Sequence, residues 1–517
     1  AEYLVVLLLS LATEAARVLF LPSPLFPSHS LPLSSLATEL ASRGHSLRWI
    51  DFGSNRSHVS LPAEVKREWW KTDGEMPSLL PSPERVWHAK EEGASLSTSA
   101  WLSSISSCDQ LLQQYMSKFQ ELINEPFDTI IVDDQFNPCG LLLTSLHRAP
   151  FIYWSLSALR TESAWAHQSP SPPSYVPVQG SKLTDDMSSV ERVYNIFLYL
   201  RALYIHQHVV HRRMTALFQK YFPSSPSPFE MERNASLNFV NTPPIFDFAR
   251  PFMPRVVFVG CIHCRNASSL PPKINTFLNG STKFIVASFG FSSWLSHSPE
   301  RIKNILFRSF VSRSKLRFVI QYEGSEEIPS NVLALPFLPL QDLLGDPRCV
   351  AHISVGGLSS VLESVYHGVP VVGIPLLQPS HDNLLRLSAR GAAILLPKTS
   401  LSQRSLTHAI DEIQKQKLKE EMEVFQDMVR DVPFSELTHA AFWVEFIERH
   451  HQIPHARSGA DSLHILQYFL IDILVFIFCC FYFFFLILIN LFYFTQFLFF
   501  SILAKKSAGI TTDKKRN

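Results

Sequence analysis

The chain of 517 residues is longer than one compact core needs, because a domain typically holds ~150 residues, so its length predicts two or three domains. Its 46 basic and 45 acidic residues leave a formal net charge of +1. Proteins that bind nucleic acid usually carry a clear basic excess. The composition therefore argues against a nucleic-acid partner and favours a small-molecule ligand.

Residues 1–15 resemble a signal peptide that lacks its initiator methionine and basic n-region. The run YLVVLLLSLATEA has the length of an apolar h-region, and Thr13 and Ala15 are placed for cleavage before Ala16. Four Asn-x-Ser/Thr sequons agree with secretion and predict a glycoprotein, although such short motifs also arise by chance: Asn55, Asn234, Asn266 and Asn279.

Residues 16–265 have the pattern of a parallel α/β domain. RVLFLP is a strand candidate, and LPLSSLATELASRGH after it repeats leucine at helical spacing until Gly44. FDTIIVDD is a buried strand that ends in two carboxylates, and CGLLLTSLHRAPFIYWS continues as helix and strand. Residues 185–225 are amphipathic and predict further helices. Such alternation of strands and helices is typical of a parallel sheet.

After a linker at residues 266–282, the alternation restarts and predicts a second parallel α/β domain over residues 283–440. KFIVASFG, LRFVIQYEG, CVAHISVGG and PVVGIP are among its strand candidates, and residues 441–470 are expected to form a C-terminal helical segment. Two such domains face each other across a cleft, and open parallel sheets bind ligands at the carboxyl ends of their strands. Polar residues at strand ends are therefore the candidates for a site.

Residues 471–504 predict one transmembrane helix, because the run between Asp472 and Lys505 has no charged residue and exceeds the ~20 residues that cross a bilayer. Lys505 and Lys506 begin a basic tail at residues 505–517, which is expected to be cytosolic with the rest of the chain lumenal. The ending KKRN resembles a dilysine retrieval signal, so we expect a single-pass type I protein of the endoplasmic reticulum membrane. One span excludes a transporter.

The seven cysteines do not indicate a disulfide scaffold at this length. Two of them lie in the predicted span, and the pairing of the other five stays open: Cys108, Cys139, Cys261, Cys264 and Cys349. Cys261-x-x-Cys264 has no second pair to complete a zinc site, so zinc is not expected there.

Several motifs, taken in order, resemble the animal UDP-glycosyltransferases, which include the glucuronosyltransferases and the ceramide galactosyltransferase. They are SH before a helix that ends in RGH, then FDTIIVD, LPLQDLLGDP, GGLSSVLESVYHGVPVVGIPL and QYFLIDI, and the match runs from near Arg17 to the tail. The resemblance implies an α/β GT-B fold of two Rossmann-like domains, the first for a lipophilic acceptor and the second for a UDP-sugar. The resemblance implies that the reaction needs no metal and no cofactor besides the UDP-sugar, which is a co-substrate. Whether the protein forms homo-oligomers, or hetero-oligomers with related transferases, stays open.

By this resemblance, His29 is the general base that takes the proton of an acceptor hydroxyl, and Asp133 is the carboxylate that orients it. Taken alone, His29 reads more simply as an ordinary loop histidine, and Asp133 as a solvated strand-end carboxylate or a helix cap. The neighbouring Asp134 stays open as an alternative partner of the base.

On the donor side, the resemblance assigns contacts with the nucleotide sugar to nine positions. They are Ser288 and Gly290 near the diphosphate, Phe337 against uracil, Gly356, Gly357, Ser359 and Ser360 at the phosphate turn, Glu363 at the ribose and Asp382 near the sugar. The glycine turn can hold a diphosphate with backbone N–H groups at the start of a helix. Glu363 also follows Ser360 at the spacing of a capping box.

Several donor positions depart from the family pattern. Val355 stands where the family has His, Ser359 where it has Asn and Leu340 where it has Gln, while Pro379 and Ser380 occupy the place of an Asp-Gln pair that reads sugar hydroxyls. Two hypotheses follow: an inverting transferase that acts on lipophilic hydroxyls or sphingolipids, and a weak or inactive paralogue that binds ligands or partners. The backbone turn favours a weak transferase, and the sugar and the acceptor stay open.

Overall fold

The structure is a computed structural model that describes residues 15–24, 29–53, 59–72, 86–87, 96–290, 295–324 and 326–513. The chain divides into two units, Ala1–Ala456 and Arg457–Asn517. The predicted signal peptide, apart from its last residue, the sequon at Asn55 and the last four residues of the tail lie outside the described residues.

Within the described residues, seven parallel strands form the first sheet, in the order β3-β2-β1-β4-β5-β6-β7. Phe20 in β1 aligns with Trp49 in β2 on one side and with Ile131 in β4 on the other. The central strands are buried almost throughout, as expected for continuous apolar runs that helices cover on both faces. The strands are β1 (Arg17–Leu21), β2 (Ser46–Gly53), β3 (Lys66–Lys71), β4 (Thr129–Asp133), β5 (Phe151–Ser155), β6 (Leu237–Val240) and β7 (Val256–Phe258).

Helices cover both faces of this sheet. Leu33 and Leu36 of α2 pack on one face, while α4, α5 and α8 cover the other, where a disulfide between Cys108 and Cys139 joins α4 to α5. The helices are α2 (Ser30–Ser42), α4 (Leu96–Asn124), α5 (Pro138–Leu146), α6 (Thr161–Ala166), α7 (Ser189–Tyr204), the π-helix η2 (Ile205–Val210), α8 (His211–Tyr221) and α9 (Pro228–Arg233). The helices expected over residues 185–225 are therefore confirmed, with a π-helical turn that the sequence pattern did not predict.

The part of the chain that the structure describes forms six parallel strands in the second sheet, in the order β10-β9-β8-β11-β12-β13, which confirms the second predicted α/β domain. Ile353 in β11 aligns with Ala287 in β8 and with Val372 in β12. The strands are β8 (Phe284–Ser288), β9 (Arg317–Gln321), β10 (Val332–Leu335), β11 (Cys349–Ser354), β12 (Val371–Gly373) and β13 (Ala393–Leu395). The helices are α10 (Pro272–Leu278), η3 (Leu295–His297), α11 (Glu300–Val311), α12 (Leu340–Leu344), α13 (Leu358–Tyr366), α14 (Gln378–Ala389), α15 (Gln403–Glu412) and α16 (Gln416–Arg430).

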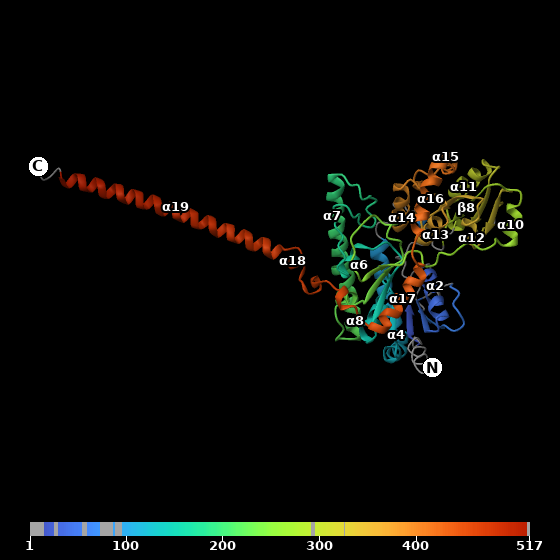
Figure 1. Cartoon of the computed structure of the whole chain (residues 1–517), viewed down its shortest axis with the longest axis horizontal. Helices are drawn as coiled ribbons and strands as arrows, with labels where there is room; N and C mark the ends of the chain where they lie inside the picture. Colours follow the sequence, from blue (N-terminus) through green and yellow to red (C-terminus); the bar gives the residue numbers. More distant parts are fainter. Residues whose placement is uncertain are drawn as a thin grey trace, which may run out of the picture. The chain divides into compact units, whose positions relative to one another are not determined.

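Helix α17 (Glu436–His450) follows the second sheet in sequence but packs on the first domain, beside α2 (Figure 1). Its Val444 and Ile447 join the core of Leu33 and Leu36. Glu445 accepts a hydrogen bond from Arg43 Nη1 at 3.0 Å. This helix ties the two domains together, and η4 (Pro454–Ala456) ends the first unit.

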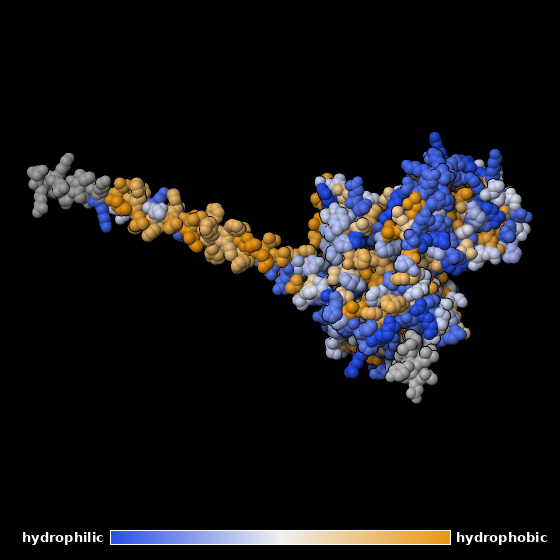
Figure 2. All heavy atoms as spheres, in the orientation of Figure 1, coloured by the Kyte–Doolittle hydropathy of each residue, from blue (hydrophilic) through white to orange (hydrophobic). Residues whose placement is uncertain are grey.

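The second unit is dominated by one long helix, α19 (Ile471–Asp513), preceded by η5 (Gly459–Ser462) and α18 (Ile465–Tyr468). The segment Ile471–Lys505 has a mean hydropathy of 2.8 and is long and apolar enough to cross a membrane. Figure 2 shows hydrophobic side chains along this helix. The predicted C-terminal span is thus one helix with the length and composition of a membrane anchor.

Candidate active site

Both sheets have their topological switch point between two inner strands, where the order of the strands reverses. In the first sheet this point lies between β1 and β4, and in the second between β8 and β11. Open parallel sheets bind ligands outside the carboxyl ends of the strands at this point. His29 and Asp133 follow the first pair, and Ser288, Gly356 and Gly357 follow the second.

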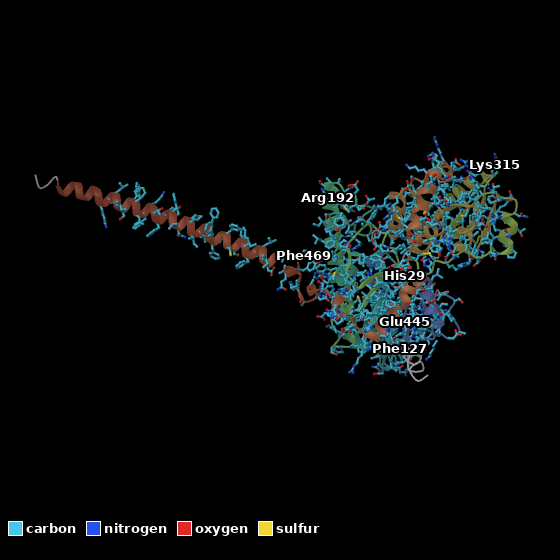
Figure 3. The ribbon with its side chains drawn as sticks, viewed as in Figure 1. His29, Phe127, Arg192, Lys315, Glu445 and Phe469 are labelled. Atoms are coloured by element: carbon cyan, nitrogen blue, oxygen red, sulfur yellow. A yellow bond between two sulfur atoms is a disulfide. The ribbon has the colours of Figure 1, made fainter. Side chains whose placement is uncertain are left out.

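His29 and Asp133 are in direct contact, although 104 positions separate them in the sequence. His29 is the residue before α2, and its Nδ1 lies 3.0 Å from Oδ2 of Asp133, the last residue of β4. Asp133 Oδ1 accepts a hydrogen bond from the backbone N–H of Gln135 at 2.9 Å. Figure 3 labels His29 within the first unit. The predicted base and its carboxylate are therefore brought together.

Burial raises the pKa of Asp133, and the charge and hydrogen bond of His29 oppose this shift. The side chain of Asp133 is fully buried, whereas that of His29 keeps 11% of its surface exposed. Because Nδ1 faces the carboxylate, it is the nitrogen that carries the proton in the neutral ring, and Nε2 is then the basic atom. The pair thus holds the histidine in the tautomer that a general base requires.

Asp134 has a different set of partners. Its Oδ2 lies 2.8 Å from Arg160 Nη2 and accepts hydrogen bonds from Ser163 Oγ at 2.9 Å and from Ser155 Oγ. Both ends of the Arg160 ion pair are buried. The alternative that Asp134 orients the base therefore finds no support in the geometry.

The turn after β11 is shaped by glycine. Gly356 has a φ of +86°, and a Cβ at this position would lie 2.6 Å from the carbonyl oxygen of Ser380, so only glycine fits. Gly357 is exposed and precedes α13, whose first backbone N–H groups have no partner within the helix. Asn383 Nδ2 donates to the carbonyl of Gly356 at 3.1 Å and holds the turn in place. Such an arrangement is a ready anion site.

The capping box expected from Ser360 and Glu363 is wrong. Helix α13 begins two residues before Ser360, with Gly357 as its N-cap residue and no side-chain cap. Ser360 Oγ instead donates to the carbonyl of Gly357 at 2.9 Å. Glu363 lies further along the helix, where it is buried and its Oε1 is 3.4 Å from His263 Nε2. The spacing matched the motif, but the helix starts earlier.

His352 is a residue of the site that sequence reasoning missed. It lies in β11, fully buried, with Nε2 2.7 Å from Ser288 Oγ and Nδ1 2.6 Å from Ser364 Oγ. Burial lowers its pKa to about 3, so the ring is neutral at physiological pH. The hydroxyl of Ser288, predicted near the diphosphate, is thus joined through His352 to α13. A histidine inside the apolar run CVAHIS was the only available signal.

Of the other donor-side residues, Gly290 and Ser359 follow β8 and β11, the strands of the second switch point, whereas Phe337 follows the edge strand β10. Gly290, with a φ of +65°, donates its N–H to Gln321 Oε1 at 3.1 Å. Ser359 lies half-buried in the first turn of α13. Phe337 leaves 66% of its surface exposed. The remaining positions that depart from the family pattern differ in exposure. Val355 and Ser380 are buried, Leu340 is half-buried and Pro379 is exposed.

Asp382 lies where the two domains meet, on α14. Its Oδ2 accepts a hydrogen bond from the backbone N–H of Gly180 at 2.6 Å, and one helical turn further Arg386 pairs with Asp247 at 2.8 Å. Burial raises the pKa of Asp382 to about 6, despite the opposing charge of Arg386. Asp382 therefore serves an interdomain contact in this structure, and any sugar hydroxyl would have to share its carboxylate.

The raised pKa of Asp382 predicts a dependence of stability on pH between about 4 and 6. The folded state binds a proton in this window that the unfolded chain has lost, so this group makes the protein less stable as pH rises from 4 to 6. Asp382→Asn is expected to be more stable above pH 6, by about 3 kcal/mol at most. Denaturant unfolding of both proteins at about pH 4.5, inside this window, and at about pH 7.5, above it, measures the difference in their free energies of unfolding. An equal gain in stability at both pH values would contradict the assignment.

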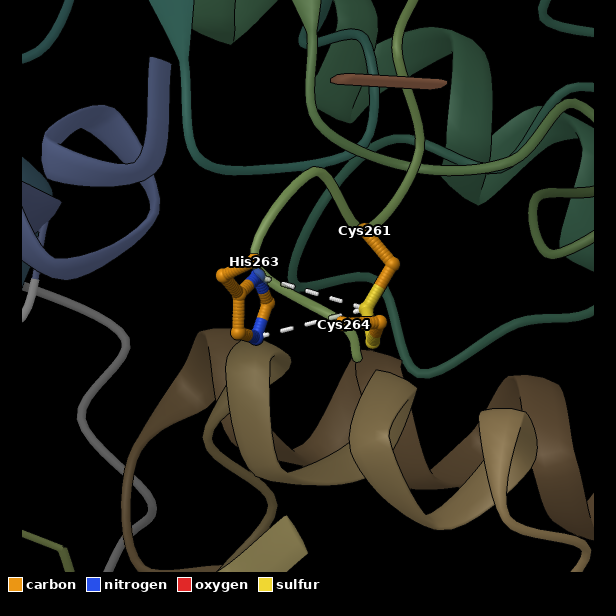
Figure 4. A group of neighbouring side chains, drawn as sticks. All are labelled: Cys261, His263 and Cys264. Carbon is orange, nitrogen blue, oxygen red and sulfur yellow. Dashed lines mark hydrogen bonds between the residues drawn. A yellow bond between two sulfur atoms is a disulfide. The ribbon is translucent and has the colours of Figure 1, made fainter. Parts of the chain in front are cut away.

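A group of Cys261, His263 and Cys264 lies between the domains, next to Glu363 (Figure 4). The two sulfur atoms are joined in a disulfide, and both ring nitrogens of His263 lie 4.0 Å from Cys261 Sγ. In this state neither sulfur is a thiolate ligand.

A separate hollow of about 460 Å³ is lined by Gly280 and Lys315 among others, at the amino ends of the strands of the second sheet, away from the switch point.

With this geometry in place, comparisons with known proteins identify the family. Residues 16–506 match the family described as UDP-glucoronosyl and UDP-glucosyl transferase. UDP-glucuronosyltransferase 2B15 of Homo sapiens is 29% identical over 88% of this chain and 88% of its own length. UDP-glucuronosyltransferase 2B17 of Homo sapiens is 32% identical over 72% of this chain and 70% of its own length.

Solved structures of glycosyltransferases share the fold. CalG4, the calicheamicin glycosyltransferase, matches with a TM-score of 0.58 and 17% identity, over 84% of this chain and 99% of its own. A UDP-glucosyltransferase from Polygonum tinctorium matches with a TM-score of 0.56 and 16% identity over the same shares. At this identity the likeness concerns the fold alone, and it confirms the predicted GT-B architecture. The chain therefore belongs to the UDP-glucuronosyl and UDP-glucosyl transferase family and is a UDP-glycosyltransferase of the GT-B fold.

Proposed function

We propose that this protein transfers a hexosyl or glucuronosyl group from a UDP-sugar to a hydroxyl group of a lipophilic small molecule or a sphingolipid, with inversion at the anomeric carbon. The contact of 3.0 Å between His29 and Asp133, at the switch point of the first sheet, carries this proposal. A buried carboxylate behind an imidazole is the arrangement that makes histidine an effective general base. Family membership supplies the donor class.

In the proposed reaction, Nε2 of His29 takes the proton of the acceptor hydroxyl as its oxygen attacks the anomeric carbon. The bond between that carbon and the diphosphate oxygen breaks in the same in-line step, so UDP leaves with the electron pair and the configuration inverts. Asp133 stabilises the imidazolium that forms. The departing diphosphate is stabilised by the backbone N–H groups at Gly357 and the first turn of α13. This assignment calls on no metal ion and no further cofactor.

The donor contacts follow the same reasoning. Phe337 is proposed to stack on uracil, Glu363 to accept hydrogen bonds from the ribose, and Ser359 and Ser360 to add hydroxyl donors at the diphosphate. Ser288, Gly290, Gly356 and Asp382 complete the set, Gly356 by allowing close approach of the backbone.

The reaction can be tested with full-length protein in detergent or membranes, incubated with UDP-glucuronic acid, UDP-glucose or UDP-galactose and with phenolic, alcoholic or sphingoid acceptors. We expect a glycoside whose anomeric configuration is opposite to that of the donor, identified by mass spectrometry and NMR. A product with the donor configuration would overturn the single-displacement mechanism. Release of the sugar to water alone would overturn the assignment as a transferase.

We further propose that the first unit is lumenal in the endoplasmic reticulum, with the basic tail in the cytosol. The three described sequon asparagines, Asn234, Asn266 and Asn279, are all exposed, as glycan acceptors must be. On expression in cells, a glycosidase that removes N-linked glycans is expected to shift the mobility of the protein, and replacement of all four sequon asparagines by Gln to abolish the shift. Digestion of the first unit by protease added to sealed microsomes would contradict this orientation.

A second candidate function is binding without efficient transfer. The observation that favours it is the departure from the family pattern at four donor-side positions, Val355, Leu340, Pro379 and Ser380, of which only Ser380 has a polar side chain. In that case the protein would hold acceptors or partners, including related transferases, through the same fold. Affinity for UDP separates the two functions, as argued in the Discussion.

A further inference from the structure

Three buried side chains converge in the first domain, apart from the catalytic pair. The Nε2 atoms of His206 and His211 each lie 3.1 Å from the same carboxylate oxygen, Oε1 of Glu232. The three side chains are more than nine-tenths buried. They come from the π-helix η2, from α8 and from α9. Their polar atoms thus face one small volume inside the protein.

The π-helical turn η2 brings the side chains of these two histidines together. His211 follows His206 by five positions, so in a regular α-helix of 3.6 residues per turn their side chains would point about 140° apart. In η2 the N–H of His211 donates to the carbonyl of His206, which closes a wider turn, and the two rings come to lie 4.2 Å apart between centroids. Turns of this kind are rare and often occur at functional sites.

The three atoms form a donor set suited to a metal ion. We propose that His206, His211 and Glu232 bind one divalent transition-metal ion, with zinc as the best chemical match. Two imidazole nitrogens and one carboxylate oxygen are common zinc ligands at about 2.0–2.1 Å, and ligands at that distance on a tetrahedron stand about 3.3 Å apart. Each Nε2 lies 3.1 Å from Oε1, close to this spacing, and one ligand atom from each of the three residues lies within 4.8 Å of the others. Three protein ligands leave the fourth position of the metal to water.

The surroundings give the ion a structural role. The ring of Trp101 packs edge-on against His206 at 5.7 Å, and Phe136 packs against Trp101 at 5.1 Å. Phe136 lies three residues after Asp133, so the site is packed against the loop that carries the catalytic carboxylate. A bound ion would tie η2, α8 and α9 together beneath this loop. Sugar transfer itself makes no use of it, and the proposal is independent of the proposed function.

The test uses full-length protein purified in detergent without a histidine tag and exchanged into metal-free buffer. We expect about one zinc ion per chain by mass spectrometry of the metal content, and its loss in Glu232→Gln, which keeps the shape of the side chain and removes its charge. His208→Gln is the matched control, because His208 lies in the same π-helical turn but is exposed, and it should keep the metal.

A second measurement keeps the proposal testable even where the Glu232 variant does not fold. Unsubstituted protein stripped of metal should rise in thermal midpoint when zinc is added, and with Co²⁺ it should show visible absorption of tetrahedral cobalt without the charge-transfer bands of thiolate ligands. Those bands would point to Cys261 and Cys264 instead and would overturn the proposal. Retention of zinc by a folded Glu232→Gln protein would do the same. So would a stripped protein that responds to neither metal, which would leave a purely hydrogen-bonded cluster.

Discussion

Replacement of His29 by Ala is expected to slow transfer to an aliphatic hydroxyl by ~100-fold or more, because a positioned base typically contributes ~10² to 10⁴ in rate. The loss should fall on kcat rather than on the affinity for UDP, since His29 lies at the switch point of the first sheet and the donor turn at that of the second. Asp133→Asn should cause a comparable loss, because an amide cannot stabilise the imidazolium. The double variant should be little worse than either single one, since the two residues act as a unit.

The acidity of the acceptor provides a sharper test of the role of His29 than the size of the loss. A phenol that is already largely ionised at the assay pH needs no base, so His29→Ala should lose much less activity with it than with an aliphatic alcohol. His408→Ala, a change at an exposed histidine of α15, is the matched control and should keep full turnover with both. An equal loss with both acceptors would show that His29 positions the acceptor rather than taking its proton.

The fold was predictable from the sequence because its central strands are buried on both faces. Segments such as RVLFL and TIIVD are continuous apolar runs, and parallel sheets require this. The order of the strands brings β1 next to β4, and it is this adjacency that places His29 beside Asp133 across 104 positions. Local sequence patterns do not show which strands are neighbours in the sheet. The pairing of His29 with Asp133 was predicted from the resemblance to a family instead.

What the sequence did not predict depends on geometry beyond one element. The capping box failed because the start of α13 is set by the turn at Gly356 and Gly357, not by the local spacing of Ser and Glu. The contact of Asp382 with Gly180 depends on how the two domains pack against each other. His206 and His211 are five residues apart, a spacing that indicates a shared face only once the turn is π-helical.

The affinity for UDP should decide between a weak transferase and a binding protein. We expect full-length protein to bind UDP at millimolar concentration, through the backbone N–H groups of the glycine turn, Phe337 and Glu363. We expect this binding to be weak, because Val355 stands where the family resemblance implies a histidine that contacts the diphosphate. A hydrogen bond to a charged group contributes ~1.5 to 3 kcal/mol, which corresponds to about 10- to 150-fold in affinity.

Val355→His is expected to restore part of this affinity, and the structure places the gain near the lower limit, at about 10-fold. Val355 leaves only 7% of its surface exposed and packs in the core of the second domain, so an imidazole must leave that packing to reach a diphosphate. Val355→Leu is the matched control, because it adds volume without a hydrogen-bond donor and should bind UDP no better than the unsubstituted protein. Calorimetry with UDP on the three full-length proteins measures these differences. Equal gains in UDP affinity for the His and Leu variants would show that packing, not a missing donor, limits binding at the turn. If neither the unsubstituted protein nor the His variant binds UDP at millimolar concentration, the non-catalytic function is the one that fits the chain.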